Sequence, residues 1–149
     1  TTPGGGRGDT RRACRLGAGN CTDFHSLLIS MSRSVEIPAR FAIGATVPQQ
    51  PGAIAGYHCW AEMSVAGRWM QVDASEAWKH PDKREYYFGN WDPDKFLISI
   101  GRNLELAPAQ AGPPVNYLVH PYVEADDVPM EGITATFEHL GGHNQEGNT

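Results

Sequence analysis

The sequence predicts an α+β domain in which one amphipathic helix packs beside an antiparallel β-sheet. Apolar residues recur at three- and four-residue spacing from Phe24 to Val35, which is the period of a helix of about four turns. Two strand-like runs, 57–65 and 68–73, flank Ala66-Gly67, a pair suited to a two-residue hairpin turn. A helix followed by hairpin-connected strands is typical of the α+β class.

The ends of the helix can be read from its flanking residues. Asn20 is a good N-cap residue, and Asp23 stands three positions later, where the acid of a capping box reaches back to the cap. Pro38 closes the helical segment, because the residue before a proline is pushed out of helical geometry.

The rest of the chain is assigned from alternation and from loop-forming residues. Residues 1–19 are predicted to be a flexible or truncated N-terminal segment, 20–125 the core, and 126–149 a C-terminal edge strand and polar tail. Within this frame we expect strands at 41–47, 95–100, 115–123 and 133–137, a loop at 48–56 and an irregular excursion at 74–94.

Composition narrows the classes of partner. Twelve basic and 17 acidic residues give a net charge of −5, so there is no overall attraction to nucleic acid. No apolar run approaches the roughly 18 residues that span a bilayer. The chain starts with neither Met nor a signal segment, as expected of a mature form or a fragment, and both cytoplasmic and exported locations stay open.

Cys21 is the first candidate for chemistry. The chain has three cysteines, Cys14, Cys21 and Cys59, so at least one thiol stays free of intrachain disulfides. Cys21 follows the predicted N-cap, where unpaired amides and the helix dipole stabilise a thiolate. A small buried hydrophobe is the alternative for such a residue.

His58 and Asp73 are the candidate partners of Cys21. If Ala66-Gly67 is the turn, the two side chains lie on one face of the hairpin, one diagonal step apart and within reach of a hydrogen bond. A carboxylate bonded to one imidazole nitrogen would leave the other nitrogen facing the thiol. A one-residue slip in register would separate them, leaving a surface histidine beside an incidental acid.

The local sequence also resembles a known family. Its motifs are similar to the nucleophile, histidine and aspartate motifs of the bacterial transglutaminase-like superfamily, and further familial segments follow. They read Gly-Asn-Cys-Thr-Asp-Phe-His-Ser-Leu (19–27), Ile-Pro-Ala-Arg-Phe (37–41), Gly-Tyr-His-Cys-Trp-Ala-Glu (56–62), Val-Asp-Ala-Ser-Glu-Ala-Trp-Lys (72–79), Tyr-Phe-Gly (87–89), Gly-Arg (101–102) and Asn-Tyr (116–117).

The resemblance implies a papain-like fold with Cys21, His58 and Asp73 as the catalytic triad. The implied reaction is acyl transfer through a thioester, acting on carboxamide or peptide bonds of a protein or peptide substrate, with no cofactor and no metal. Hydrolysis or proteolysis, deamidation and transamidation all stay open, since the triad does not choose between water and an amine. The alternative is a catalytically inactive protein-interaction module on the same scaffold.

The chain departs from the family pattern in two places. Family members carry more helical sequence upstream, so part of the cleft, including one oxyanion-hole donor, is expected outside this chain. Asn103 stands where an acid is expected after Gly-Arg, which we interpret as a change in a structural contact.

Several other residues have competing interpretations. Cys21, Asp23, His25, His58 and Cys59 are zinc ligands by type, but their spacing lacks the paired motifs of zinc sites. His25 is expected to be structural and Cys59 to face the core. Asp23 is expected to cap the helix, Arg40 to form an ion pair, and Trp60 and Trp69 to be core residues.

Overall fold

The computed structural model describes residues 6–141. Its centre is a four-stranded antiparallel sheet in the order β4-β3-β1-β5. The strands are β1 (Ala39–Thr46), β3 (His58–Val65), β4 (Arg68–Val72) and β5 (Lys95–Ile100). The predicted α+β class is therefore confirmed.

The hairpin of β3 and β4 has the register that the sequence predicts. Val65 pairs with Arg68, and the pairing runs back to Ala61 and Val72. Ala66 and Gly67 have φ values of 50° and 77°, the positive values that a tight two-residue hairpin turn needs. The turn thus fixes which residues of the two strands share a face.

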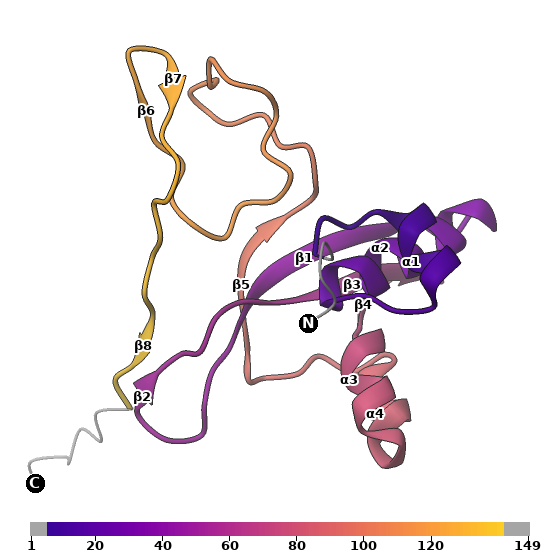
Figure 1. The fold of residues 1–149 in the computed structure, drawn as a ribbon. Helices are drawn as coiled ribbons and strands as arrows, with labels where there is room; N and C mark the ends of the chain where they lie inside the picture. The colour runs from indigo at the N-terminus through magenta and orange to yellow at the C-terminus, as the bar shows by residue number, and fades with distance from the viewer. Residues whose placement is uncertain (1–5, 142–149) are drawn as a thin grey trace, which may run out of the picture.

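Helix α2 (Cys21–Ser34) packs against the sheet, and helix α1 (Thr10–Leu16) lies beside α2 (Figure 1). The apolar core between α2 and the sheet contains Ile29 from the helix and fully buried residues of β1 and β3, among them Ile43, Cys59 and Ala61. The helix expected from the spacing of apolar residues is present, but the predicted apolar stripe is not its buried face. Met31 and Val35 of that stripe are exposed, and apart from Ile29 the buried residues of α2 are polar: Thr22, Asp23, His25, Ser26 and Ser32.

The N-terminal segment was expected to be irregular, and for residues 10–16 that expectation is wrong. Asp9 caps α1 by accepting the Arg12 N–H at 2.9 Å, and Gly17 ends the helix with a left-handed φ of 59°. Ala13 is buried, so contacts with the rest of the domain stabilise a helix too short to persist alone.

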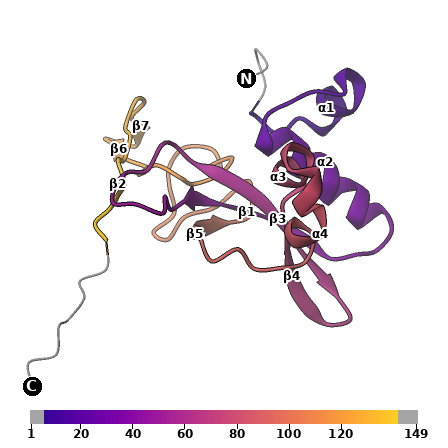
Figure 2. The same cartoon turned by 90° about the horizontal axis from the view of Figure 1, so that it is seen from below.

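The excursion at 74–94 is also more regular than predicted. It contains α3 (Ala74–Lys79), the 3₁₀ turn η1 (Pro81–Lys83) and α4 (Arg84–Tyr87). Figures 1 and 2 both place the helices together at one end of the molecule, away from the β6–β7 and β2–β8 pairs. Helix α3 matters for the site because Asp73 is its N-cap.

The C-terminal third differs from the strands expected there. Residues 115–123 form no strand and contribute a single bridge, Val115 to Leu104. The expected edge strand at 133–137 is absent; β8 (Glu138–His139) instead pairs with β2 (Gly52–Ala53) in the predicted loop. A small hairpin, β6 (Glu124–Ala125) with β7 (Val128–Pro129), completes the element list. Residues 142–149 of the predicted tail lie outside the described residues.

Gly44 allows β5 to lie close to β1. A Cβ atom at this position would lie 1.7 Å from the Phe96 carbonyl oxygen, and the pairing of β1 with β5 shifts register at Ile43/Gly44. This close approach places Lys95, the first residue of β5, beside the end of the β3–β4 hairpin. Among residues 6–141, no helix is long and apolar enough to cross a membrane.

Candidate active site

Cys21 is the first residue of α2, as the sequence predicts. Asp23 holds this helix start by accepting the Asn20 N–H at 2.9 Å, and it also accepts the N–H groups of Gly6 and Gly8 at 2.7 and 3.0 Å. The first amides of a helix have no partner inside the helix and favour negative charge. The half-buried Cys21 thiol therefore lies where a thiolate is stabilised.

His58 and Asp73 meet at the open end of the hairpin. The His58 Nε2 atom lies 2.6 Å from Asp73 Oδ2, so the hydrogen bond expected from the register is present. The two side chains are 14% and 1% exposed, so water barely competes for this bond. Because Nε2 is engaged by the carboxylate, Nδ1 is the ring nitrogen left for Cys21.

Cys21 and His58 form a charged pair. Hydrogen bonds from Cys59 and then from His58 lower the pKa of Cys21 to about 4, against the opposing effect of burial. Burial would lower the pKa of His58, but hydrogen bonds with Asp73 and Cys21 raise it to about 9. Between these two values the thiolate and the imidazolium coexist, which is the reactive state of a Cys-His nucleophile.

Asp73 is held by donors on both oxygens. Its Oδ1 accepts the Ser75 hydroxyl at 2.9 Å and the Glu76 N–H at 3.0 Å, which makes it the N-cap of α3. Its Oδ2 faces His58 and the Lys95 ammonium, the latter at 2.7 Å. Burial would raise the pKa of Asp73, but its contacts with His25 and His58 hold it well below its usual range.

His25 is a buried structural residue, as expected, and it lies inside the site. Its Nδ1 lies 2.7 Å from the Cys21 carbonyl oxygen, while Nε2 accepts the Ala74 N–H at 3.1 Å. The same Nε2 is 3.4 Å from Asp73 Oδ1. His25 therefore links the start of α2 to the start of α3 and fixes the distance between nucleophile and carboxylate.

Cys59 is fully buried in the core, as the alternation along β3 predicts, yet it also reaches the site. Its Sγ lies 3.7 Å from both the Thr22 hydroxyl and His25 Nδ1, and its thiol lowers the pKa of Cys21. Burial raises the pKa of Cys59, so this second thiol stays protonated beside the first. Cys14 is exposed on α1.

Lys95 is the residue that sequence reasoning missed. Its side chain is 3% exposed, and its ammonium contacts the same Asp73 oxygen as His58. A lysine at a strand start is usually a solvated edge residue, and nothing in the spacing brings position 95 to position 73. The register shift opposite Gly44 does so.

The remaining predicted residues take the places expected of them with one exception. Arg40 pairs with the buried carboxylate of Glu62 at 2.6 Å. Trp60 is buried beside His58, its ring centroid 6.4 Å from the imidazole. Trp69 is 38% exposed and carries the Arg40 guanidinium on its face at 4.2 Å, so assigning it to the core was wrong.

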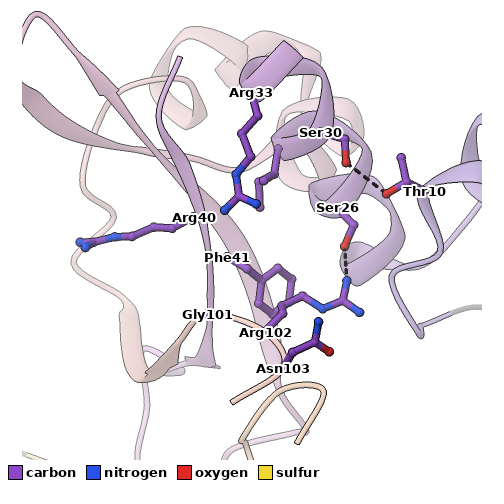
Figure 3. A pocket seen from close by; sticks show the side chains of 10 residues that line it. Thr10, Ser26, Ser30, Arg33, Arg40, Phe41, Gly101, Arg102 and Asn103 are labelled. Carbon is purple, nitrogen blue, oxygen red and sulfur yellow. Dashed lines mark hydrogen bonds between the residues drawn. The ribbon is translucent and has the colours of Figure 1, made fainter. Parts of the chain in front are cut away.

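A polar hollow of about 360 Å³ lies along another stripe of α2 (Figure 3). Arg102 closes one side of it by donating to Ser26 Oγ at 2.7 Å, the Arg7 carbonyl at 2.6 Å and Asn116 Oδ1 at 3.0 Å. The Gly-Arg and Asn-Tyr segments of the sequence are thus in contact. Asn103, with a φ of 53°, donates its N–H to the Asn116 carbonyl at 3.2 Å, a structural contact.

The zinc hypothesis receives no support from the geometry. Within residues 6–141, no group of three or more His, Cys, Asp or Glu side chains is arranged to hold a metal ion. The donor atoms of His25, His58 and Asp73 bond to one another and to backbone groups instead.

Comparison with known proteins gives the family. Residues 1–74 match the transglutaminase-like superfamily, and the match includes Cys21, His58 and Asp73. No curated protein and no solved structure gave a match. This family match confirms the likeness of the sequence motifs that lie within residues 1–74, and this part of the chain is similar to the transglutaminase-like superfamily; the segments at 87–89, 101–102 and 116–117 lie outside the matched residues.

Proposed function

We propose that this chain is a cysteine acyl-transfer enzyme that acts on carboxamide or peptide bonds. The observation that carries the proposal is the hydrogen bond of 2.6 Å between His58 and Asp73, beside a Cys21 thiol that itself raises the pKa of His58. In this proposal Cys21 is the nucleophile, His58 the acid and base, and Asp73 the group that orients the imidazole.

The first half of the reaction forms a thioester. The Cys21 Sγ attacks the carbonyl carbon of a bound carboxamide or peptide, and the carbonyl oxygen becomes an oxyanion. The Cys21 N–H is at the start of α2, where amides lack helical partners, and is one candidate donor to that oxyanion. His58 then gives its proton to the departing ammonia or amine, and the C–N bond breaks.

The second half regenerates the thiolate. Water or an amine, deprotonated by neutral His58, attacks the thioester carbon, and the C–S bond breaks to restore Cys21. Water gives deamidation or peptide cleavage, and an amine gives transamidation. We favour hydrolysis or proteolysis, because the bacterial branch that the motifs resemble carries out broader chemistry than cross-linking.

The proposal is tested by mass spectrometry on two substrate sets, a glutamine-containing peptide and a peptide library, each with and without a primary amine. Deamidation raises the peptide mass slightly, transamidation adds the amine with loss of ammonia, and proteolysis gives fragments. Cys21→Ala should reduce every product to background, while Cys14→Ser is the matched control that should retain activity.

The opposite result would favour the inactive interaction module. In that case no acyl-enzyme would form on either substrate set, and the wild-type chain and Cys21→Ala would not differ in their products.

A further inference from the structure

Lys95 is a buried lysine that the acyl-transfer scheme leaves without a role. Its side chain is 3% exposed, and its ammonium lies 5.7 Å and 5.5 Å from the ring centroids of Trp60 and Tyr87. A buried ammonium is costly unless it is paired. Its closest carboxylate oxygen is Asp73 Oδ2, at 2.7 Å, and Asp92 Oδ2 follows at 3.6 Å.

Two cationic donors therefore converge on a single oxygen atom. His58 Nε2 lies 2.6 Å from Asp73 Oδ2 and Lys95 Nζ lies 2.7 Å from it, so the two nitrogens are at most 5.3 Å apart. Like charges at this distance oppose each other, and each donor weakens the hold of the carboxylate on the other. With Lys95 present, the His58 imidazolium should therefore be easier to deprotonate than it would be if only Asp73 faced it.

The other charged and titratable groups around His58 come from α2, from the start of α3 and from the segment before β5. Cys21, from α2, and Asp73, at the start of α3, both favour the imidazolium. His25, also from α2, meets His58 edge-on at 6.5 Å and contacts the opposite oxygen of the carboxylate. Asp92 lies beyond Lys95 and is 14% exposed. Lys95 is the cation among these neighbours that faces the His58–Asp73 bond directly.

We propose that Lys95 is a positioning residue of the site, which shares the Asp73 carboxylate with His58 and so keeps the imidazolium able to release its proton. This inference rests on the proposed function for its use in catalysis. The proton concerned is the one that His58 gives to the departing nitrogen, which an imidazolium held too tightly would retain. The same ammonium, 2.7 Å from Asp73 Oδ2, holds that oxygen in place beside His58.

The experiment is an NMR titration of the His58 ring nitrogens in the full chain. Replacing Lys95 by Met or Gln removes the charge, so the His58 midpoint should rise by about 1 pH unit or more. Lys95→Arg keeps the charge and should leave the midpoint near the wild-type value. Lys83→Met removes an exposed lysine from η1 and is the matched control that should change nothing.

A structural role alone would lower stability and leave the midpoint in place, and that outcome in either folded neutral variant overturns the inference. If neither neutral variant folds, the wild-type chain decides, because the Lys95 Nζ resonance should then move through the His58 midpoint. A Lys95 Nζ resonance that does not shift as the pH passes the His58 midpoint would also overturn the inference. None of these readouts needs turnover, so a failed substrate assay would refute the proposed function and leave the charge-sharing result standing.

Discussion

The three cysteines occupy three different environments, and their reactivities should differ accordingly. Cys14 is exposed, Cys59 is fully buried, and Cys21 is half-buried at a helix start. Burial raises the pKa of Cys59, whereas hydrogen bonds from Cys59 and His58 lower the pKa of Cys21 to about 4. Exposure to solvent therefore favours reaction at the Cys14 thiol, whereas the lowered pKa favours reaction at Cys21.

Alkylation by iodoacetamide, followed by peptide mass spectrometry, separates these effects. Cys21 should react several-fold faster than Cys14 at about pH 6, because an ordinary thiol is then less than about 1% ionised. The gain is modest because a thiolate of low pKa is a weaker nucleophile. The sharper signature is a Cys21 rate that stays nearly constant from about pH 5 to 8, since its thiolate population is already complete.

The matched variants isolate the cause. His58→Ala should slow Cys21 at about pH 6 and restore a rate that climbs with pH, because the stabilising imidazolium is lost. Cys14→Ser should leave the Cys21 rate unchanged. Equal rates for Cys21 and Cys14 that rise together toward about pH 8.5 would contradict an activated nucleophile.

For single residues, the sequence predicts those side-chain contacts that follow from local geometry. Cys21 follows from a capped helix start, and the His58–Asp73 contact follows from a two-residue turn that sets the register. The contacts of Lys95 and Cys59 with the site do not follow in this way. They depend on how β5 pairs with β1 and how α2 packs on β3, which no local pattern encodes.

At the scale of elements, sequence and structure agree where one local signal dominates. The period of α2, its cap and the Ala66-Gly67 turn each have such a signal, and each is present. Residues 115–123 have strand-like composition but find only one bridging partner, so they stay irregular. Helix α1 lies in a Gly- and Arg-rich segment whose composition favours a loop, although Asp9 and Gly17 are suitable caps for a helix.

Gly44 is the element-scale feature that can be tested directly. An alanine Cβ there would lie 1.7 Å from the Phe96 carbonyl oxygen, which is backbone and cannot rotate away. Gly44→Ala should therefore push β5 from β1 and lower the free energy of unfolding by about 3 kcal/mol, measured by urea denaturation. Lys95 would move with β5, so the His58 midpoint should rise as in the neutral Lys95 variants.

The control is a glycine where an added methyl group meets nothing. A Cβ at Gly132 would have no neighbour within 4 Å, and only its φ of 77° opposes an alanine. Gly132→Ala should cost about 1 kcal/mol and leave His58 unaffected. A Gly44→Ala chain as stable as Gly132→Ala would show that β5 is not held by this close approach.

For the whole molecule, the charged pair makes stability depend on pH in a specific way. The pKa of Cys21 is lowered from 9.0 to about 4, so its contribution is complete above 9.0 and is lost as the pH falls toward 4. The pKa of His58 is raised from 6.5 to about 9, so its contribution is complete below 6.5 and is lost as the pH rises toward 9. The two slopes oppose each other between about pH 6.5 and 9.

Below about pH 6.5 the thiol of the pair titrates and the imidazole does not, so the two pH ranges should differ in slope. From about pH 4 to 6.5 the Cys21 contribution should raise the free energy of unfolding by up to about 3 kcal/mol, and from about 6.5 to 9 the pair should contribute little net slope. Asp73 does not disturb this window, because its pKa lies below the usual range for an aspartate. Urea denaturation at a series of pH values measures both slopes.

Cys21→Ala separates the thiol from the many carboxylates that also titrate near pH 4, because those carboxylates remain in the variant. The difference in unfolding free energy between the wild-type chain and Cys21→Ala should grow steadily from about pH 4 to 6.5, by up to about 3 kcal/mol. Above about pH 6.5 the variant alone should lose stability, since Asp73 still raises the pKa of His58 with no thiolate titration to offset the slope. Cys14→Ser should follow the wild-type curve throughout. Parallel curves for the wild-type chain and Cys21→Ala would mean that Cys21 is a neutral thiol in the folded protein, and the ion pair on which the reaction depends would then be absent.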